Sequence, residues 1–166
     1  MQAARALAPA IAPPSLDLPR DLGRRAAWSL AEEALLSPKP GLVDRRGRGA
    51  HADLDLGLML RSAAVLEPSF VAMADAAQAR GRADAPLRET LGRLGRAAEH
   101  TMMNATGGVN THRGAIWALG LLTGAAALEH DNTSAADTAR WAGTIARHAD
   151  RFAPAHFGKR PSRDIE

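Results

Sequence analysis

The chain contains no cysteine and no tyrosine, and aromatic residues make up only 4% of its 166 residues. Without cysteine it can form no disulfide framework, no Cys-ligated zinc or iron–sulfur site and no thiolate nucleophile. Few aromatic residues beside abundant alanine favour closely packed helices over a β-sandwich, which is usually rich in Val, Ile, Tyr and Thr. These absences predict an all-α fold whose own side chains perform no redox chemistry.

The chain also lacks a large excess of one charge, since it has 21 Lys and Arg and 18 Asp and Glu, which gives a net charge of +3. A nucleic-acid-binding protein more often has a basic stripe interleaved with aromatic residues, so we expect no nucleic-acid partner. The longest uncharged apolar run, 114–128, is shorter than the ~20 residues that cross a bilayer. The proline-containing N-terminus has no continuous apolar stretch of the kind found in secretory signals. We therefore expect a cytoplasmic protein that does not engage membranes.

The length and the 46% hydrophobic content are those of one globular domain. Four prolines among the first twenty residues oppose regular structure there. We expect a disordered segment over 1–20, a helical domain over 21–152 with Asp21 as its first N-cap, and an irregular tail over 153–166.

About five helices are predicted, joined by one long loop. Their expected ranges are 22–36, Asp53 or Asp55 to about 79, 86–104, 112–129 and 134–149. Pro68 is expected to kink or divide the second helix. The fourth is apolar all round and is therefore expected at the centre of a helical bundle. Residues 37–52 are too rich in proline and glycine for a helix and are predicted to form a structured loop.

The long loop and the helix start after it carry mixed charges. Carboxylate oxygens hold Mg²⁺, and Lys or Arg neutralises phosphate oxygens, so such a loop suits a polyphosphate with its divalent metal. Two alternatives stay open: a solvated charged loop, and an N-cap role for one of the two later aspartates. The residues concerned are Lys39, Asp44, Arg45, Arg46, Arg48, His51, Asp53 and Asp55.

A second polar segment, 107–114, leads into the apolar fourth helix. Free backbone N–H groups at a helix start attract anions, Gly107 and Gly108 let a ligand approach the main chain, and Arg113 adds a charge-assisted donor. The spacing is not that of a P-loop. The alternative is a glycine turn with Thr111 as N-cap and His112 as a partly buried spacer, and composition does not decide between the two.

Two motifs in this order resemble the signatures of triphosphoribosyl-dephospho-CoA synthases. The first reads EALLSPKPGLVD at 33–44 and continues as GAHAD at 49–53, and the second reads GGVNTHRGAIWALGLL at 107–122. The residues of the two motifs are most similar to those of the malonate decarboxylase branch of the family. The resemblance spans about Arg24 to Phe157. It implies an all-helical enzyme that makes a prosthetic-group precursor from ATP and 3′-dephospho-CoA and releases adenine.

The implied reaction is attack of the 2′-hydroxyl of dephospho-CoA on the ribose C1 of ATP, with inversion at that carbon. We assign Asp44, His51 and Asp53 to catalysis, and Asp44 and Asp53 also to a Mg²⁺ that accompanies ATP. The loop should then lie against the start of the fourth helix, in one cleft. The residues assigned to substrate binding by motif position are Glu33, Lys39, Gly107, Gly108, Asn110, His112 and Arg113.

The family's third signature, which resembles SHG…YG…GARGEA, is not found in this chain, and residues 157–166 read FGKRPSRDIE. From this we expect a C-terminally truncated form of a larger helical fold, with weak or absent adenine release and self-association through a bare face. Two other classes stay open. One is a nucleotide-binding helical module without turnover, and the other is a subunit-interaction protein.

Overall fold

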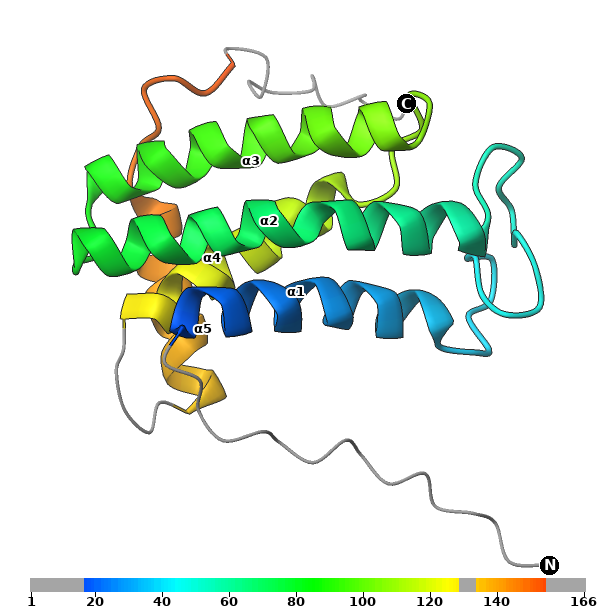
Figure 1. Ribbon diagram of the computed structural model, residues 1–166, viewed down its shortest axis with the longest axis horizontal. Coiled ribbons are helices and arrows are strands. Elements are labelled where there is room, and N and C mark those ends of the chain that lie inside the picture. The colour runs from blue at the N-terminus through cyan, green and yellow to red at the C-terminus, as the bar shows by residue number, and fades with distance from the viewer. Residues whose placement is uncertain (1–16, 129–133, 155–166) are drawn as a thin grey trace, which may run out of the picture.

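The computed structural model describes residues 17–128 and 134–154, and within these ranges the chain forms five α-helices and no β-strand (Figure 1). The all-α prediction is therefore confirmed. Most of the predicted disordered segment and most of the predicted tail lie outside the described residues. The helices are α1 (Leu18–Leu35), α2 (Leu56–Arg80), α3 (Ala85–Ala105), α4 (Arg113–Leu128) and α5 (Ala135–Arg147).

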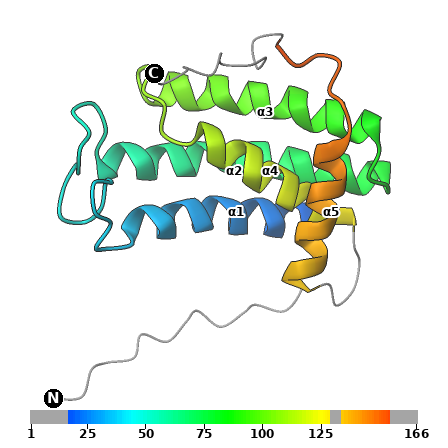
Figure 2. The ribbon, with the colours of Figure 1, turned by 180° about the vertical axis from the view of Figure 1, so that it is seen from behind.

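Three long helices form one layer, with α2 between α1 and α3 (Figure 1). On the other side, α4 lies across this layer and α5 crosses one end of it (Figure 2). Within the layer α2 is the central helix, because it contacts both α1 and α3. The fourth helix was expected at the centre, and α4 contacts all four other described helices, although it packs on one side of the layer.

Side-chain caps set the starts of four described helices. Asp17, Asp55, Asp84 and Ser134 each accept a hydrogen bond from a backbone N–H in the first turn that follows. Asp55 is thus the cap of α2, as one of the two alternatives predicted. The first helix begins four residues earlier than expected, because Asp17 rather than Asp21 is its cap. Pro19 does not oppose this start, since a first-turn residue needs no N–H partner.

Pro68 lies inside α2 and does not divide it. Residues on both sides of the proline are buried, among them Leu66 before it and Phe70 and Met73 after it. By length and hydropathy α2 would also be able to cross a membrane, but its contacts with three neighbouring helices are those of a core helix. Packing on both sides of Pro68 offsets the loss of one backbone hydrogen bond.

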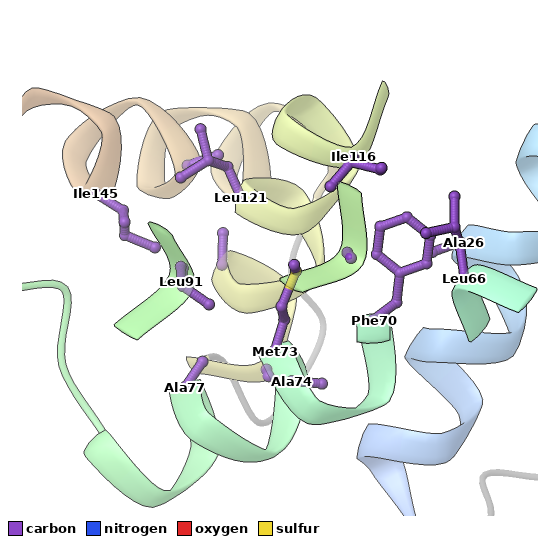
Figure 3. Close-up of a cluster of buried hydrophobic side chains, with 14 of the residues drawn as sticks. Ala26, Leu66, Phe70, Met73, Ala74, Ala77, Leu91, Ile116, Leu121 and Ile145 are labelled. Atoms are coloured by element: carbon purple, nitrogen blue, oxygen red, sulfur yellow. The ribbon is translucent and has the colours of Figure 1, made fainter. Parts of the chain in front are cut away.

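The main core lies between the layer and α4 (Figure 3). Phe70 and Met73 of α2 are fully buried there, together with Ile116 of α4 and Ile145 of α5. The side of α4 that faces away from the core is also apolar. We call residues Gly114, Trp117, Ala118 and Leu122, all exposed, the α4 stripe. The fourth helix is therefore apolar all round, as predicted, but one side of it is uncovered within the described residues.

Candidate functional site

The loop from Leu36 to Asp55 and the linker from α3 to α4 lie at the same end of the molecule (Figures 1 and 2). Up-and-down packing causes this, because α1 and α3 both end there and α2 and α4 both begin there. Apart from one isolated bridge between Asp44 and Gly47, the loop has no regular secondary structure. The prediction of a long structured loop is confirmed.

Asp44 is the internal anchor of this loop. Its carboxylate, 3% exposed, accepts hydrogen bonds from the backbone N–H groups of Lys39 (2.8 Å) and Arg46 (2.7 Å). It also accepts from the Ser37 hydroxyl (3.1 Å) and Arg46 Nε (2.9 Å). The Lys39 amide, followed by the donors of Arg46 and Ser37, holds the pKa of this carboxyl well below its usual range. Asp44 is therefore ionised and fully engaged within the loop.

A cavity of about 310 Å³ lies within the loop, and its lining residues include three cations, Lys39, Arg46 and Arg48, and one anion, Asp44. Gly49 shapes its wall, because its φ is +58° and a Cβ there would lie 2.6 Å from the Gly41 carbonyl oxygen. Only glycine fits such a position without strain. The cavity thus combines cations with an approachable main chain, which is the chemistry that polyphosphates require.

Each of the three cations already has an anionic partner. Lys39 Nζ lies 3.1 Å from Glu33 Oε1 and donates to the Glu33 carbonyl oxygen at 2.8 Å. Arg46 pairs with Asp44, and Arg48 pairs with Asp55 at 3.3 Å. Lys39 thereby ties the end of α1 to the cavity. The structure places Glu33 and Lys39 together, as their shared motif predicted.

His51 and Asp53 are exposed and do not line this cavity. In the described structure their side chains make no hydrogen bond or ion pair. Nothing in the geometry brings them to Asp44, so their catalytic assignment stays a prediction. The alternative that Asp53 caps the second helix is wrong, because Asp55 does so.

An apolar cluster joins the loop to the α3–α4 linker. Val43 and Leu54 of the loop are buried with Ala34 of α1 and Met59 of α2, and Val109 of the linker packs against them. The two motifs thus meet, as the sequence predicted. The loop cavity, however, has no linker residue in its wall, so a single cleft shared by both motifs is not formed in the described structure.

His112 is buried at the start of α4 and is held from three sides. Its Nδ1 lies 2.9 Å from the Ser62 hydroxyl of α2, which also lies 2.6 Å from the Thr111 hydroxyl. Its backbone N–H donates to the Met102 sulfur at 3.2 Å. Nε2 is buried and has no hydrogen-bond partner among the described residues. Burial lowers the pKa of His112, so the imidazole is neutral near pH 7.

The rest of the second motif forms the turn into α4. Gly107 and Gly108 have φ values of +65° and +92°, which confirms the glycine turn. Asn110 Oδ1 accepts from the Arg113 N–H at 3.2 Å, so the alternative of Thr111 as N-cap is wrong. Arg113 is exposed and pairs with Glu99 of α3 at 3.2 Å. Asn110 and Arg113 therefore lie on the outside of the turn and His112 on the inside.

Ser62 is the residue of this site that the sequence did not reveal. It lies fifty positions before His112, inside an apolar stretch of α2. The one signal in the sequence is a serine placed among the apolar residues Met59, Ala63 and Leu66, which in the structure is fully buried. This signal does not identify His112 as the hydrogen-bond partner.

The fit of Mg²⁺ to the predicted ligands was poor. Both oxygens of Asp44 are occupied by hydrogen-bond donors, and Asp53 is exposed. Within residues 17–128 and 134–154 no three His, Asp or Glu side chains gather in a metal-binding group. The protein groups described here therefore do not form a magnesium site by themselves.

Residues 19–164 match the family described as ATP:dephospho-CoA triphosphoribosyl transferase. A Pseudomonas aeruginosa protein named "Probable 2-(5''-triphosphoribosyl)-3'-dephosphocoenzyme-A synthase" is 60% identical over 141 residues, which are 85% of this chain and 48% of that protein. A Pseudomonas fluorescens protein of the same name is 57% identical over equal shares. A Klebsiella pneumoniae 2-(5''-triphosphoribosyl)-3'-dephosphocoenzyme-A synthase is 56% identical over 83% of this chain and 49% of its own.

No solved structure matches the chain. The chain spans about half the length of the curated relatives it matches. The family match covers nearly all of the sequence, including both motifs and the helices that position them. The chain therefore belongs to the family of ATP:dephospho-CoA triphosphoribosyl transferases.

Proposed function

We propose that the chain takes part in triphosphoribosyl transfer from ATP to 3′-dephospho-CoA, with release of adenine. The observation that carries this is the cationic cavity of the loop that holds the first family motif, which a shared apolar cluster ties to the second motif. The product would be the prosthetic-group precursor of the malonate decarboxylase acyl carrier protein. The reaction would take place in the cytoplasm.

The triphosphate is the part of ATP that suits the loop cavity. Lys39, Arg46 and Arg48 offer guanidinium and ammonium donors there, and the positive-φ glycines of its wall let a ligand approach the main chain. We propose that Mg²⁺ enters as part of the MgATP substrate, held by phosphate oxygens rather than by Asp44. Asp44 then acts indirectly, by holding the Lys39 and Arg46 segments around the phosphates.

Binding of MgATP to purified protein, measured by calorimetry, tests this assignment. Lys39→Ala should weaken binding by about 1.5–3 kcal/mol, since it removes a charge-assisted hydrogen bond. Arg45→Ala is the matched control, because Arg45 is an exposed cation of the same loop that does not line the cavity. Equal losses in the two variants, or no binding by the unaltered chain, would contradict the cavity assignment.

Adenine release in the presence of 3′-dephospho-CoA, followed by chromatography, tests the chemistry separately. Release that depends on both substrates supports the transfer reaction. MgATP binding without adenine release supports the second candidate, a nucleotide-binding helical module. That candidate is favoured by one observation, namely that the loop cavity has no residue of the second motif in its wall within the described structure.

We also propose that two copies of the chain associate through the α4 stripe, which is apolar and exposed within the described residues.

A further inference from the structure

Ser62 uses its hydroxyl differently from other hydroxyl side chains in these helices. Ser29, Thr90 and Thr101 donate to the carbonyl oxygen one turn earlier in their own helix. Ser62 instead reaches across the fold to Thr111 and His112, at 2.6 Å and 2.9 Å. It is fully buried, so its single proton must serve one of these two neighbours.

The two hydrogen bonds that join His112, Ser62 and Thr111 can have either of two donor directions. If Ser62 donates to Nδ1, the neutral imidazole carries its proton on Nε2, and a buried N–H donor is left without an acceptor. If Nδ1–H donates to Ser62 and Ser62 donates to Thr111, the buried group left without a partner is the Nε2 lone pair, while the proton of the half-buried Thr111 hydroxyl is free to meet solvent. Buried N–H groups without an acceptor are the rarer of the two cases in proteins. The second direction is therefore favoured.

We propose that Ser62 is a positioning residue which, with Thr111, fixes His112 as its Nδ1–H tautomer and leaves Nε2 as the acceptor for the proton of the attacking hydroxyl. This inference rests on the proposed transfer reaction. The 2′-oxygen of dephospho-CoA would bond to the ribose C1 of ATP while the C1–N9 bond breaks. The bonding electron pair leaves with adenine, which takes a proton from water, and the hydroxyl proton goes to Nε2.

The groups around the site favour Nε2 of His112 over Asp44 as the proton acceptor. Asp44 is a poor base for this proton, because four donor groups occupy its carboxylate oxygens and lower its pKa. Among the charged groups near His112, Glu33 raises its pKa and Lys39 lowers it, while the remaining neighbours Ser62, Thr111 and Met102 are uncharged. Lys39 also lines the loop cavity. A triphosphate that draws Lys39 away from Glu33 would therefore make Nε2 more basic.

The tautomer can be read directly by ¹⁵N NMR of the histidine ring, in which the nitrogen that carries the proton resonates upfield of the bare one. His112 is assigned by comparison with a His112→Gln spectrum. We expect the unaltered chain to show Nδ1–H. Thr111→Val removes the acceptor for the Ser62 proton, so Ser62 should turn to Nδ1 and the proton should move to Nε2.

Thr111→Ser keeps the hydroxyl and should restore Nδ1–H, and Ser69→Ala, elsewhere on α2, should leave it unchanged. The Nε2–H form in the unaltered chain would overturn the proposal, as would Nδ1–H in Thr111→Val. Because these spectra need no substrate, they decide the positioning role even if the transfer reaction is not observed.

Addition of MgATP and 3′-dephospho-CoA tests the acceptor role. We expect the Nε2 resonance to shift while Nδ1 keeps its proton. If MgATP binds by calorimetry and Nε2 does not respond, the acceptor role is wrong and the proposed function stands. If MgATP does not bind, the proposed function is contradicted.

Discussion

At the scale of single residues, Asp44 shows how a motif residue can line a cavity and also hold the loop around it together. Its carboxylate is turned inward to gather backbone N–H groups of Lys39 and Arg46. A buried carboxylate engaged in this way is costly to leave partly unsatisfied. The motif led us to assign Asp44 to catalysis and Mg²⁺, and the catalytic assignment stays a prediction. Its use as a loop anchor was not predicted, because it depends on a chain path that the motif does not specify.

Asp44→Asn should loosen the loop, because an amide N–H₂ group would face donors that need an acceptor. We expect the backbone amides of Lys39 and Arg46 to exchange hydrogen roughly tenfold faster than in the unaltered chain, because local opening becomes easier. Exchange measured by NMR checks this, with Arg45→Ala as the control. Unchanged protection in Asp44→Asn would mean that the hydrogen bonds do not hold the loop.

The same carboxyl should make loop protection pH-dependent. Its pKa is lowered in the folded chain, so its stabilising effect is present above its unfolded pKa of about 3.9 and is lost as pH falls below that value. We expect protection of the Lys39 amide to fall below about pH 4 in the unaltered chain. The fall should be absent from Asp44→Asn, which has no carboxyl to protonate.

His112 should affect global stability in a higher pH range. Burial lowers its pKa, so the folded state disfavours the imidazolium, and stability is full above its unfolded pKa of about 6.5. Below that pH the unfolded state binds more protons, and stability should fall by at most about 1.4 kcal/mol per pH unit. Urea unfolding at pH 7.5 and pH 5.5 measures the effect. His112→Gln should reduce the difference, and His100→Gln, at an exposed position, should not.

At the scale of helices, close approach between α1 and α2 depends on Gly23. A Cβ at this position would lie 2.8 Å from the backbone nitrogen of Val71, which cannot move aside as a flexible side chain would. Gly23→Ala should therefore destabilise the fold by about 1–3 kcal/mol, despite the better helix propensity of alanine. Gly57→Ala is the matched control in α2, where the nearest atom would be 3.4 Å away. Equal stability of the two variants in urea would contradict this account of the helix contact.

The helices could be predicted because their signals are local. Periodic apolar residues and capping side chains lie within a few positions of each helix end, and Asp55 was one of the two caps predicted for the second helix in this way. The start of α1 was missed because Asp17 and Asp21 are both plausible caps, and tertiary packing rather than propensity selects between them. The bond from Ser62 to His112 could not be predicted, since it joins residues fifty positions apart.

At the scale of the whole molecule, topology explains why two motifs more than sixty positions apart meet. Four consecutive helices run up and down, so the first and third connections fall at the same end (Figure 1). Val109 then reaches the cluster around Val43 and Leu54. This meeting was predicted from the resemblance of both motifs to one family, and the order and antiparallel packing of the helices are its physical reason.

The α4 stripe gives a prediction for the whole molecule in solution. Its four residues fall on one side of the helix at 3.6 residues per turn, and none carries a charge that would oppose association. We expect the purified chain to self-associate as its concentration rises, in analytical ultracentrifugation. Leu122→Gln should weaken the association roughly tenfold, since an apolar side chain is then no longer transferred from water. Leu42→Gln removes an equally apolar, exposed side chain from the loop and should have no such effect. A concentration-independent monomer, or equal effects of the two variants, would show that the α4 stripe is not the surface through which copies of this chain meet.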